Sequence, residues 1–263
     1  MKNIYLFAAM LCTLIVKAQT PSTTTNRDAP VQSDVYAWKN LPIEKKATSE
    51  RRQILDGSGP VLSNLEIHAT TIDPGTAPHA PHHHEEEELF IIKEGSVTIT
   101  INGKSQVLGA GSVAVAMPGE EHGMLNTGKT KATYYVIKYK SRDSVQHQRA
   151  TNAGGSFMIN WDTVTFRPHD KGGLRKFTER PTAMLKRFEM HVTTLNAGIK
   201  SHDPHTHKAE EIVLLIDGHG EMQIGDKFKK VEAGDLVFLG SNVLHAIRND
   251  NDKTCTYFAF QFE

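Results

Sequence analysis

Histidine and glutamate are concentrated in one short segment, PHAPHHHEEEE at residues 78–88. In an extended strand every second side chain points the same way. His82 and His84 can therefore face one cavity, and Glu88 keeps the same parity four residues later. His122, from a more distant strand, can complete the set. Three imidazoles and one carboxylate suit a divalent ion such as Mn, Fe, Ni, Zn or Cu and leave positions open for substrate or water.

The same pattern recurs in SHDPHTHKAEE at residues 201–211. A single shift of 123 positions, the difference between His205 and His82, pairs each candidate ligand with an identical residue. The second predicted metal-binding set is His205, His207, Glu211 and His245. His83 has no such counterpart, because Thr206 takes its place, and we expect His83 at the surface.

The repeat extends over nearly the whole chain without a gap. LEIHATTIDPG at residues 65–75 lies over FEMHVTTLNAG at residues 188–198 when the same shift is applied. Such regular self-similarity decides the fold class before any local propensity. We predict a tandem duplication with one half at residues 34–140, a linker at 141–153, and a second half at 154–263.

Both halves have the pattern of β-structure. In LEIHATTI and FEMHVTTL apolar and polar residues alternate, which is typical of strands with one buried face. Asn102-Gly103 is a strong two-residue hairpin signal, and Gly225-Asp226 takes its place in the second half. No segment shows a sustained helical period. The sequence therefore predicts an all-β fold of two tandem antiparallel β-barrels, packed as one unit.

Within each half the residues follow the pattern G-x6-H-x-H-x3-E-x6-G and then G-x10-H-x3-N. This pattern resembles the two signature motifs of the cupin superfamily, and the duplication makes the chain similar to a bicupin. The resemblance implies a jelly-roll type barrel in each half and gives the eight candidate residues the role of metal ligands. The chain departs from the family in its turns. One residue more than usual precedes the first His, and GSNVLH in the second half lacks the usual Pro.

Four further repeated residues are candidate catalytic groups. His79 and His202 precede the first ligand of each set by three residues. Each either hydrogen-bonds to a loop backbone or acts as a general acid or base near the metal. Arg52 and Arg175 either form surface ion pairs or hold a substrate carboxylate through two parallel hydrogen bonds.

Other repeated side chains have two interpretations each. Glutamate and histidine on the polar face of one strand line a pocket or form a structural polar layer; they are Glu66, His68, Glu189 and His191. Tyr134 and Tyr257 are either core residues or proton donors. We expect Trp38 and Trp161 to cover a barrel face.

The overall charge argues against nucleic acid as a principal partner. The chain has 30 basic and 30 acidic residues, a formal net charge of zero, and no long basic stripe. Phosphate binding requires a concentrated positive surface. The expected ligand is therefore a small molecule or a protein.

The N-terminal segment MKNIYLFAAMLCTLIVKAQT is typical of a secretory signal at residues 1–18, cut near Gln19. A retained anchor helix is the alternative, although the apolar run is short for a bilayer. Residues 19–33 are rich in Thr, Ser and Pro and are predicted to be a flexible tether. After cleavage only Cys255 remains, so no internal disulfide is expected. We expect a periplasmic or secreted protein that is not bound to a membrane after cleavage. The sequence does not decide between a monomer and a homodimer.

Together these features predict an exported metal-dependent enzyme that acts on a small carboxylate-bearing carbohydrate fragment. Elimination, dehydration or isomerisation of an unsaturated uronate from polysaccharide breakdown is the favoured reaction. An oxygen-using dioxygenase or decarboxylase is one alternative. A non-catalytic sugar- or metal-binding protein is the other.

The two halves differ in the charges beside their ligands. Glu85 and Glu86 of the first half are replaced by Lys208 and Ala209 in the second. Acidic residues also flank His122. Negative charge stabilises a cation but repels an anionic substrate. We therefore expect the second half to be the active one.

Overall fold

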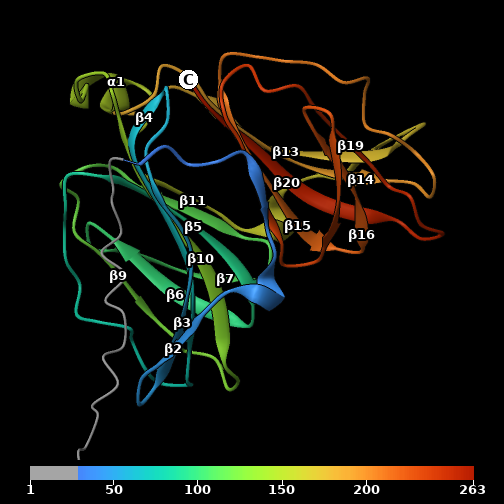
Figure 1. Cartoon of the computed structure of the whole chain (residues 1–263). Coiled ribbons are helices and arrows are strands. Elements are labelled where there is room, and N and C mark those ends of the chain that lie inside the picture. Colours follow the sequence, from blue (N-terminus) through green and yellow to red (C-terminus); the bar gives the residue numbers. More distant parts are fainter. Residues whose placement is uncertain (1–28) are drawn as a thin grey trace, which may run out of the picture.

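The computed structural model describes residues 29–263. The predicted signal peptide and most of the predicted tether lie outside the described residues. The two halves lie side by side in Figure 1, the first in blue to green and the second in orange to red. The described helices include none that is long and apolar enough to cross a membrane.

The described chain is built almost entirely of strands. The first half contains β1 Asp34–Tyr36, β2 Ile43–Lys45, β3 Ser49–Gly57, β4 Leu62–Ile72, β5 Glu87–Glu94, β6 Ser96–Ile101, β7 Lys104–Gly109, β8 Val113–Ala116, β9 His122–Leu125 and β10 Ala132–Ser141. The second half contains β11 Phe157–Ile159, β12 Arg167–His169, β13 Gly172–Arg180, β14 Phe188–Leu195, β15 Glu210–Asp217, β16 His219–Ile224, β17 Lys227–Glu232, β18 Leu236–Leu239, β19 His245–Arg248 and β20 Cys255–Phe262. Short helical segments are η1 Trp38–Asn40, α1 His147–Asn152 and η2 Trp161–Thr163. The six-residue α1 lies in the predicted linker and is too short to give a clear helical period in the sequence.

Each barrel consists of a seven-stranded sheet facing a three-stranded one. In the first barrel the strand orders are β11-β8-β5-β10-β4-β3-β2 and β7-β6-β9. In the second they are β1-β18-β15-β20-β14-β13-β12 and β17-β16-β19. The predicted all-β fold of two antiparallel barrels is confirmed. The predicted hairpin is present as well, with positive φ at both Asn102 and Gly103.

The two halves exchange their first strands. β1 pairs with β18, so that Val35 lies opposite Val237, and β11 pairs with β8, so that Met158 lies opposite Ala114. Each barrel is therefore completed by a strand from the other half of the sequence. The predicted boundaries at residues 34 and 154 follow the sequence repeat, whereas β1 and β11 each join the barrel of the other half. Sequence similarity between the halves contains no information about which barrel a terminal strand joins.

A tryptophan follows each exchanged strand and packs on the other barrel. Trp161 lies so close to Gly111 that an added Cβ would be 2.4 Å from its ring, and Gly111 has a φ of +80°. Trp38 covers Gly234 in the same manner. The expectation that these rings cover a barrel face is correct, but each covers the barrel of the opposite half.

The hydrophobic core has three parts. One fills the first barrel and another fills the second. The third and largest lies between the two seven-stranded sheets, where Tyr139 and Phe262 meet with ring centroids 5.0 Å apart. The central strands of each seven-stranded sheet are therefore buried on both faces.

Two buried glutamates also link the halves. Glu87 accepts hydrogen bonds from the Thr182 hydroxyl at 2.8 Å and from the Met184 amide at 2.9 Å. Its counterpart Glu210 accepts one from the amide of Leu62 at 3.1 Å. Burial raises the pKa of both carboxyls.

The described end of the predicted tether is ordered against the first barrel. The Val31 amide donates to the Ser58 carbonyl at 2.8 Å, and the Ser58 amide donates to the Ala29 carbonyl at 3.0 Å. The Ser33 hydroxyl accepts from the Gly240 amide at 2.8 Å. The prediction of a flexible tether up to residue 33 is therefore wrong for residues 29–33, which bond to the first half through their backbone and to the second through the Ser33 hydroxyl.

We predict that Gly111→Ala destabilises the protein more than Gly103→Ala. Both glycines have positive φ, but no atom lies within 4 Å of an added Cβ at Gly103. Forcing alanine into the left-handed region costs about 1–2 kcal/mol at either site. Displacing Trp161 adds overpacking of about 1–3 kcal/mol at Gly111 alone. Urea unfolding of the two variants measures the difference, and equal losses would show that the exchanged tryptophan does not constrain the barrel.

Candidate metal centre

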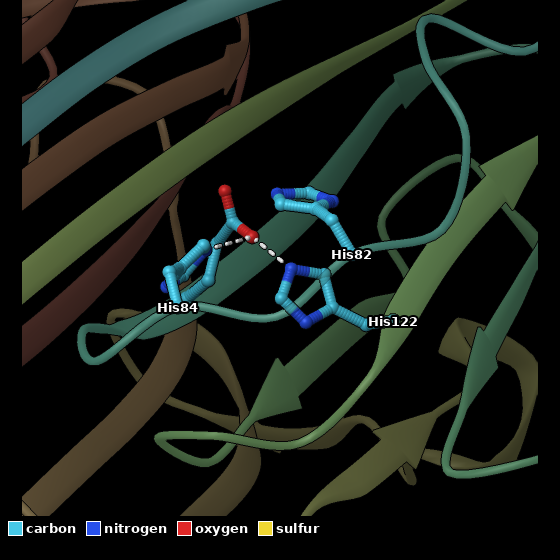
Figure 2. Close-up of side chains that lie close together, drawn as sticks. His82, His84 and His122 are labelled. Carbon is cyan, nitrogen blue, oxygen red and sulfur yellow. Dashed lines mark hydrogen bonds and ion pairs between the residues drawn. The ribbon is translucent and has the colours of Figure 1, made fainter.

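The four predicted residues of the first half meet in one cluster. His82 and His84 lie in the loop before β5, Glu88 is the second residue of β5, and His122 begins β9. Backbone hydrogen bonds in both directions between His82 and His122, at 3.0 and 2.8 Å, join the loop to β9. One ligand atom from each of the four lies within 4.8 Å of the others. Figure 2 shows the three rings converging, with dashed lines marking contacts to a carboxylate oxygen.

The buried Glu88 carboxylate is the centre of this cluster. Its Oε2 lies 3.2 Å from His84 Nε2 and 2.6 Å from His122 Nε2. Although burial opposes ionisation, the nearby His122 and His84 rings lower the pKa of Glu88 to about 2. The residue therefore presents a carboxylate, the form that binds a cation.

Backbone carbonyls fix the orientation of most candidate imidazoles. The Nδ1 atoms of four of them lie 2.8–3.1 Å from carbonyl oxygens; they are His84, His122, His207 and His245. A carbonyl only accepts, so these Nδ1 atoms carry a proton, and the Nε2 atoms, which lie against the glutamates, are the ones that would bind a metal. A metal-binding histidine is commonly held in this way by its second nitrogen.

The second cluster repeats this arrangement, but its carboxylate is not close to all three histidines. Ligand atoms of His205, His207 and His245 lie within 4.8 Å of one another. Glu211 is 2.7 Å from His207 Nε2 and 3.5 Å from His245 Nε2, but it is not within that limit of all three histidines. Its pKa is lowered by the two rings against the effect of burial.

The donor set fits a divalent ion of borderline softness. The Nε2 atoms of His122 and His245 are buried, and apart from their contacts with the Glu88 and Glu211 carboxylates they have no hydrogen-bond partner. An unpaired polar atom inside a protein is costly unless another partner satisfies it. Three imidazoles and a carboxylate at each centre are ligands of Mn, Fe, Co, Ni, Cu or Zn. The residues present therefore support a divalent metal at each centre.

A pocket opens onto each cluster from the barrel interior. The first has a volume of about 280 Å³ and the second about 300 Å³. His68 and Tyr134 line the first, and their counterparts His191 and Tyr257 line the second. Burial raises the pKa of both tyrosines far above neutrality, so they keep their protons.

His79 and His202 combine both interpretations of the sequence. The His79 ring stands perpendicular to the His82 ring with centroids 4.4 Å apart, and it lines the first pocket. Its Nδ1 donates to the Ala80 carbonyl at 3.0 Å. His202 repeats this arrangement beside His205. Each is thus a loop histidine bonded to backbone and also a pocket wall with Nε2 left as an acceptor.

The prediction that Arg52 and Arg175 reach the pocket is wrong. The Arg52 guanidinium lies 4.8 Å from the centre of the Trp38 ring, and the Arg175 guanidinium lies 4.5 Å from that of Trp161. Arg52 pairs across the strands with Ala69, which belongs to the core between the sheets. Both arginines therefore face the junction of the two barrels, where they stack on tryptophan.

The sequence reasoning missed the cations that do line the first pocket. They are Lys46, Arg51 and Lys138. Arg51 and Lys138 lie 2.6 and 3.0 Å from the buried carboxylate of Glu66. The nearby His68 ring, 3.3 Å away, and Lys138 lower the pKa of Glu66 despite burial. A usable signal existed, because Lys138 falls on Gln261 and Arg51 falls on Leu174 in the repeat, so the two halves differ in charge at both strand positions.

The prediction of a more acidic first pocket is wrong as well. The side chain of Glu87 points into the other half, and that of Glu85 is exposed and pairs with Lys140 at 2.8 Å. Glu120 receives a hydrogen bond from Ser156. Spacing along the chain could not reveal that these carboxylates leave the pocket. His83 is exposed, as predicted.

The family of the chain follows from two separate matches. Residues 69–138 and residues 191–260 each match the model of the cupin domain. Together they cover more than half of the chain, and each contains all four clustered residues of its half. The chain belongs to the cupin family and carries two cupin domains in tandem.

Solved structures of oxalate decarboxylases share this fold. The formate complex of the Lactobacillus farciminis enzyme superposes with a TM-score of 0.67 at 13% identity, covering 90% of this chain and 88% of that chain. A Bacillus subtilis oxalate decarboxylase studied for its Mn(II) centres gives 0.65 at 14% identity, covering 90% and 79%. At such identities the likeness shows the fold alone.

A curated relative matches only a short stretch. The "Uncharacterized HTH-type transcriptional regulator YdeC" of Bacillus subtilis (strain 168) is 32% identical over 85 residues. The match spans 32% of this chain and 29% of that relative. It therefore says nothing about the activity of the whole protein.

We predict two equivalents of divalent metal per chain and one equivalent in either His84→Ala or His207→Ala. Each substitution removes one imidazole from one cluster and leaves the other cluster intact. Elemental analysis after reconstitution and desalting measures the metal content. The exposed His83→Ala is the control and keeps two equivalents. If one substitution removed both metals, or if neither substitution removed any metal, the result would contradict two independent centres.

Proposed function

We propose that the protein is a metal-dependent enzyme whose first barrel binds a small substrate through a carboxylate. The observation that carries this proposal is the position of Arg51 and Lys138 on the wall of the pocket that contains the His82, His84, Glu88 and His122 cluster. The pocket volume of about 280 Å³ lies near the lower end for ligand sites, which favours a monomeric or smaller substrate.

The charges of the first pocket favour an anion. Glu66 compensates one of the two cations it contacts, and exposed Lys46, which also lies 3.6 Å from Glu44, lines the same pocket. An arginine and a lysine held by a common carboxylate are already oriented, so less entropy is lost when a substrate binds. The second pocket lacks this arrangement, because Leu174 and Gln261 stand where the first half has Arg51 and Lys138.

The chain supplies a proton acceptor beside the cluster. Because the Ala80 carbonyl fixes the Nδ1 proton of His79, Nε2 is free to take a proton from a substrate held in the pocket. Arg51 and Lys138 would orient the substrate carboxylate from the wall of β3 and β10. A divalent ion bound by the cluster would supply Lewis acidity toward the substrate oxygen atoms.

Elimination, dehydration or isomerisation of an unsaturated uronate fragment is the reaction we propose first. Such a reaction needs a carboxylate-binding wall and a base, and the pocket offers both. The signal-like residues 1–18 support a site of action in the periplasm or outside the cell, where fragments of polysaccharides occur.

An oxygen-using decarboxylase or dioxygenase is the second candidate. The fold shared with oxalate decarboxylases supports it, and the small basic pocket would accept a short carboxylic acid. Turnover of unsaturated uronates and of oxalate, with and without oxygen and followed by product mass spectrometry, separates the two reactions. Saturable binding of either acid without any product would contradict an enzyme and indicate a binding protein.

We predict that Arg51→Met and Lys138→Met each raise KM about 10- to 100-fold while metal content stays at the wild-type level. Removal of one charge-assisted hydrogen bond accounts for a loss of about 1.5–3 kcal/mol in binding. Lys140→Met is the matched control, because it lies two residues further along β10 and pairs with Glu85 outside the pocket. Unchanged KM in both pocket variants, or equal turnover of a neutral analogue, would overturn carboxylate recognition.

A further inference from the structure

Position 261 distinguishes the second metal centre from the first. Gln261 on β20 lies opposite Glu211 on β15, as Lys138 lies opposite Glu88 in the first barrel. The amide nitrogen of Gln261 donates to Glu211 Oε2 at 3.2 Å and lies 3.3 Å from His207 Nε2. Lys138 is instead engaged by Glu66. Among the described contacts, the Glu88 carboxylate meets only the rings of its own cluster.

Arg187 fixes which end of the Gln261 amide faces the centre. Its Nη1 donates to Gln261 Oε1 at 3.0 Å, so the amide oxygen is turned outward and the NH₂ group inward. The Arg187 Nε in turn donates to Glu179 at 3.2 Å. A line of hydrogen bonds therefore runs from the rim of β13 to the carboxylate of Glu211. The first half has Asp56 and Asn64 at the positions of Glu179 and Arg187.

We propose that Gln261 is a positioning residue that holds the Glu211 carboxylate of the second metal centre, a role that no residue outside the cluster has for Glu88 among the described contacts. Hydrogen bonds to a metal-binding carboxylate hold it in the binding orientation before the ion arrives. Glu211 receives such a bond from a group that would not itself ligate the ion, whereas Glu88 would lose its only described partners once His84 and His122 turned their nitrogens to a metal.

Gln261 and Lys138 each line the pocket of their own barrel, but they differ in charge. Gln261 lines the second pocket directly beside His207 and Glu211. A neutral donor at this place favours retention of a cation, because it adds no positive charge beside it. Lys138 favours an incoming anion at the cost of repelling the cation. The two centres thus differ at one pair of equivalent residues, Lys138 and Gln261. The positioning role of Gln261 does not depend on the proposed substrate.

The test compares the zinc affinities of the two centres in single-site proteins. His84→Ala leaves the second centre and His207→Ala leaves the first, and competition with a chromophoric zinc chelator measures each dissociation constant. In the His84→Ala protein we expect Gln261→Met to weaken zinc binding about 10- to 100-fold, the usual effect of losing such a partner. Arg187→Met, which only frees the amide to rotate, weakens zinc binding in the same direction by a smaller factor.

The matched control is Lys138→Met in the His207→Ala protein, which we expect to cause no loss of zinc affinity. Co(II) absorption spectra give a second readout, since Gln261→Met changes the ligand field of the second centre and Lys138→Met does not change that of the first. Equal zinc affinity with and without Gln261, in a variant whose metal-free unfolding is unchanged, overturns the proposal. Altered affinity without any enzymatic turnover supports this proposal and contradicts the proposed function.

Discussion

The central strands of each seven-stranded sheet are buried on both faces, and this constraint determines where their functional side chains point. Because strand residues alternate between faces, one set enters the barrel interior and the other enters the core between the barrels. Glu87 and Glu88 illustrate the division: Glu87 crosses to Thr182 in the other half, and Glu88 faces the histidines. The centre and the junction between the halves are thus built from adjacent residues of one strand.

Burial on both faces also requires that every inward charge has a partner. An isolated buried charge costs several kcal/mol even after the protein relaxes. In the first barrel Glu66 serves both Arg51 and Lys138, and His68 lies against the same carboxylate. In the second barrel Glu189 pairs with His191 at 2.8 Å, and Gln261 is neutral. The same fold therefore places Arg51 and Lys138 on the wall of the first pocket and neither cation at the equivalent positions of the second, where Lys171 is the lysine of the lining.

The sequence was sufficient to predict the fold and both ligand clusters, because their signals are local or repeated. The two histidines and the glutamate of each motif lie close together in the chain, and the shift of 123 positions that relates His82 to His205 locates the second set. The all-β class follows from alternation of polar and apolar residues. These features do not depend on how distant segments meet.

Features that depend on distant pairing could not be predicted. Whether Arg51 or Arg52 faces the pocket depends on the register of β3 against β4. That register shifts between Gln53 and Leu55. The exchange of β1 and β11 depends on where the chain crosses between barrels. The acidic residues near His84 and His122 were assigned to the pocket from their spacing alone, whereas their true directions depend on partners such as Ser156 and Lys140.

The most direct test is anomalous diffraction from crystals of the manganese-loaded protein soaked in oxalate. The account predicts one anomalous peak within each histidine cluster, and a carboxylate bound in the first pocket in contact with Arg51 or Lys138. The second centre should hold its ion beside Gln261 without the acid. An anion bound only at the second centre, or manganese absent from both clusters, would contradict the account.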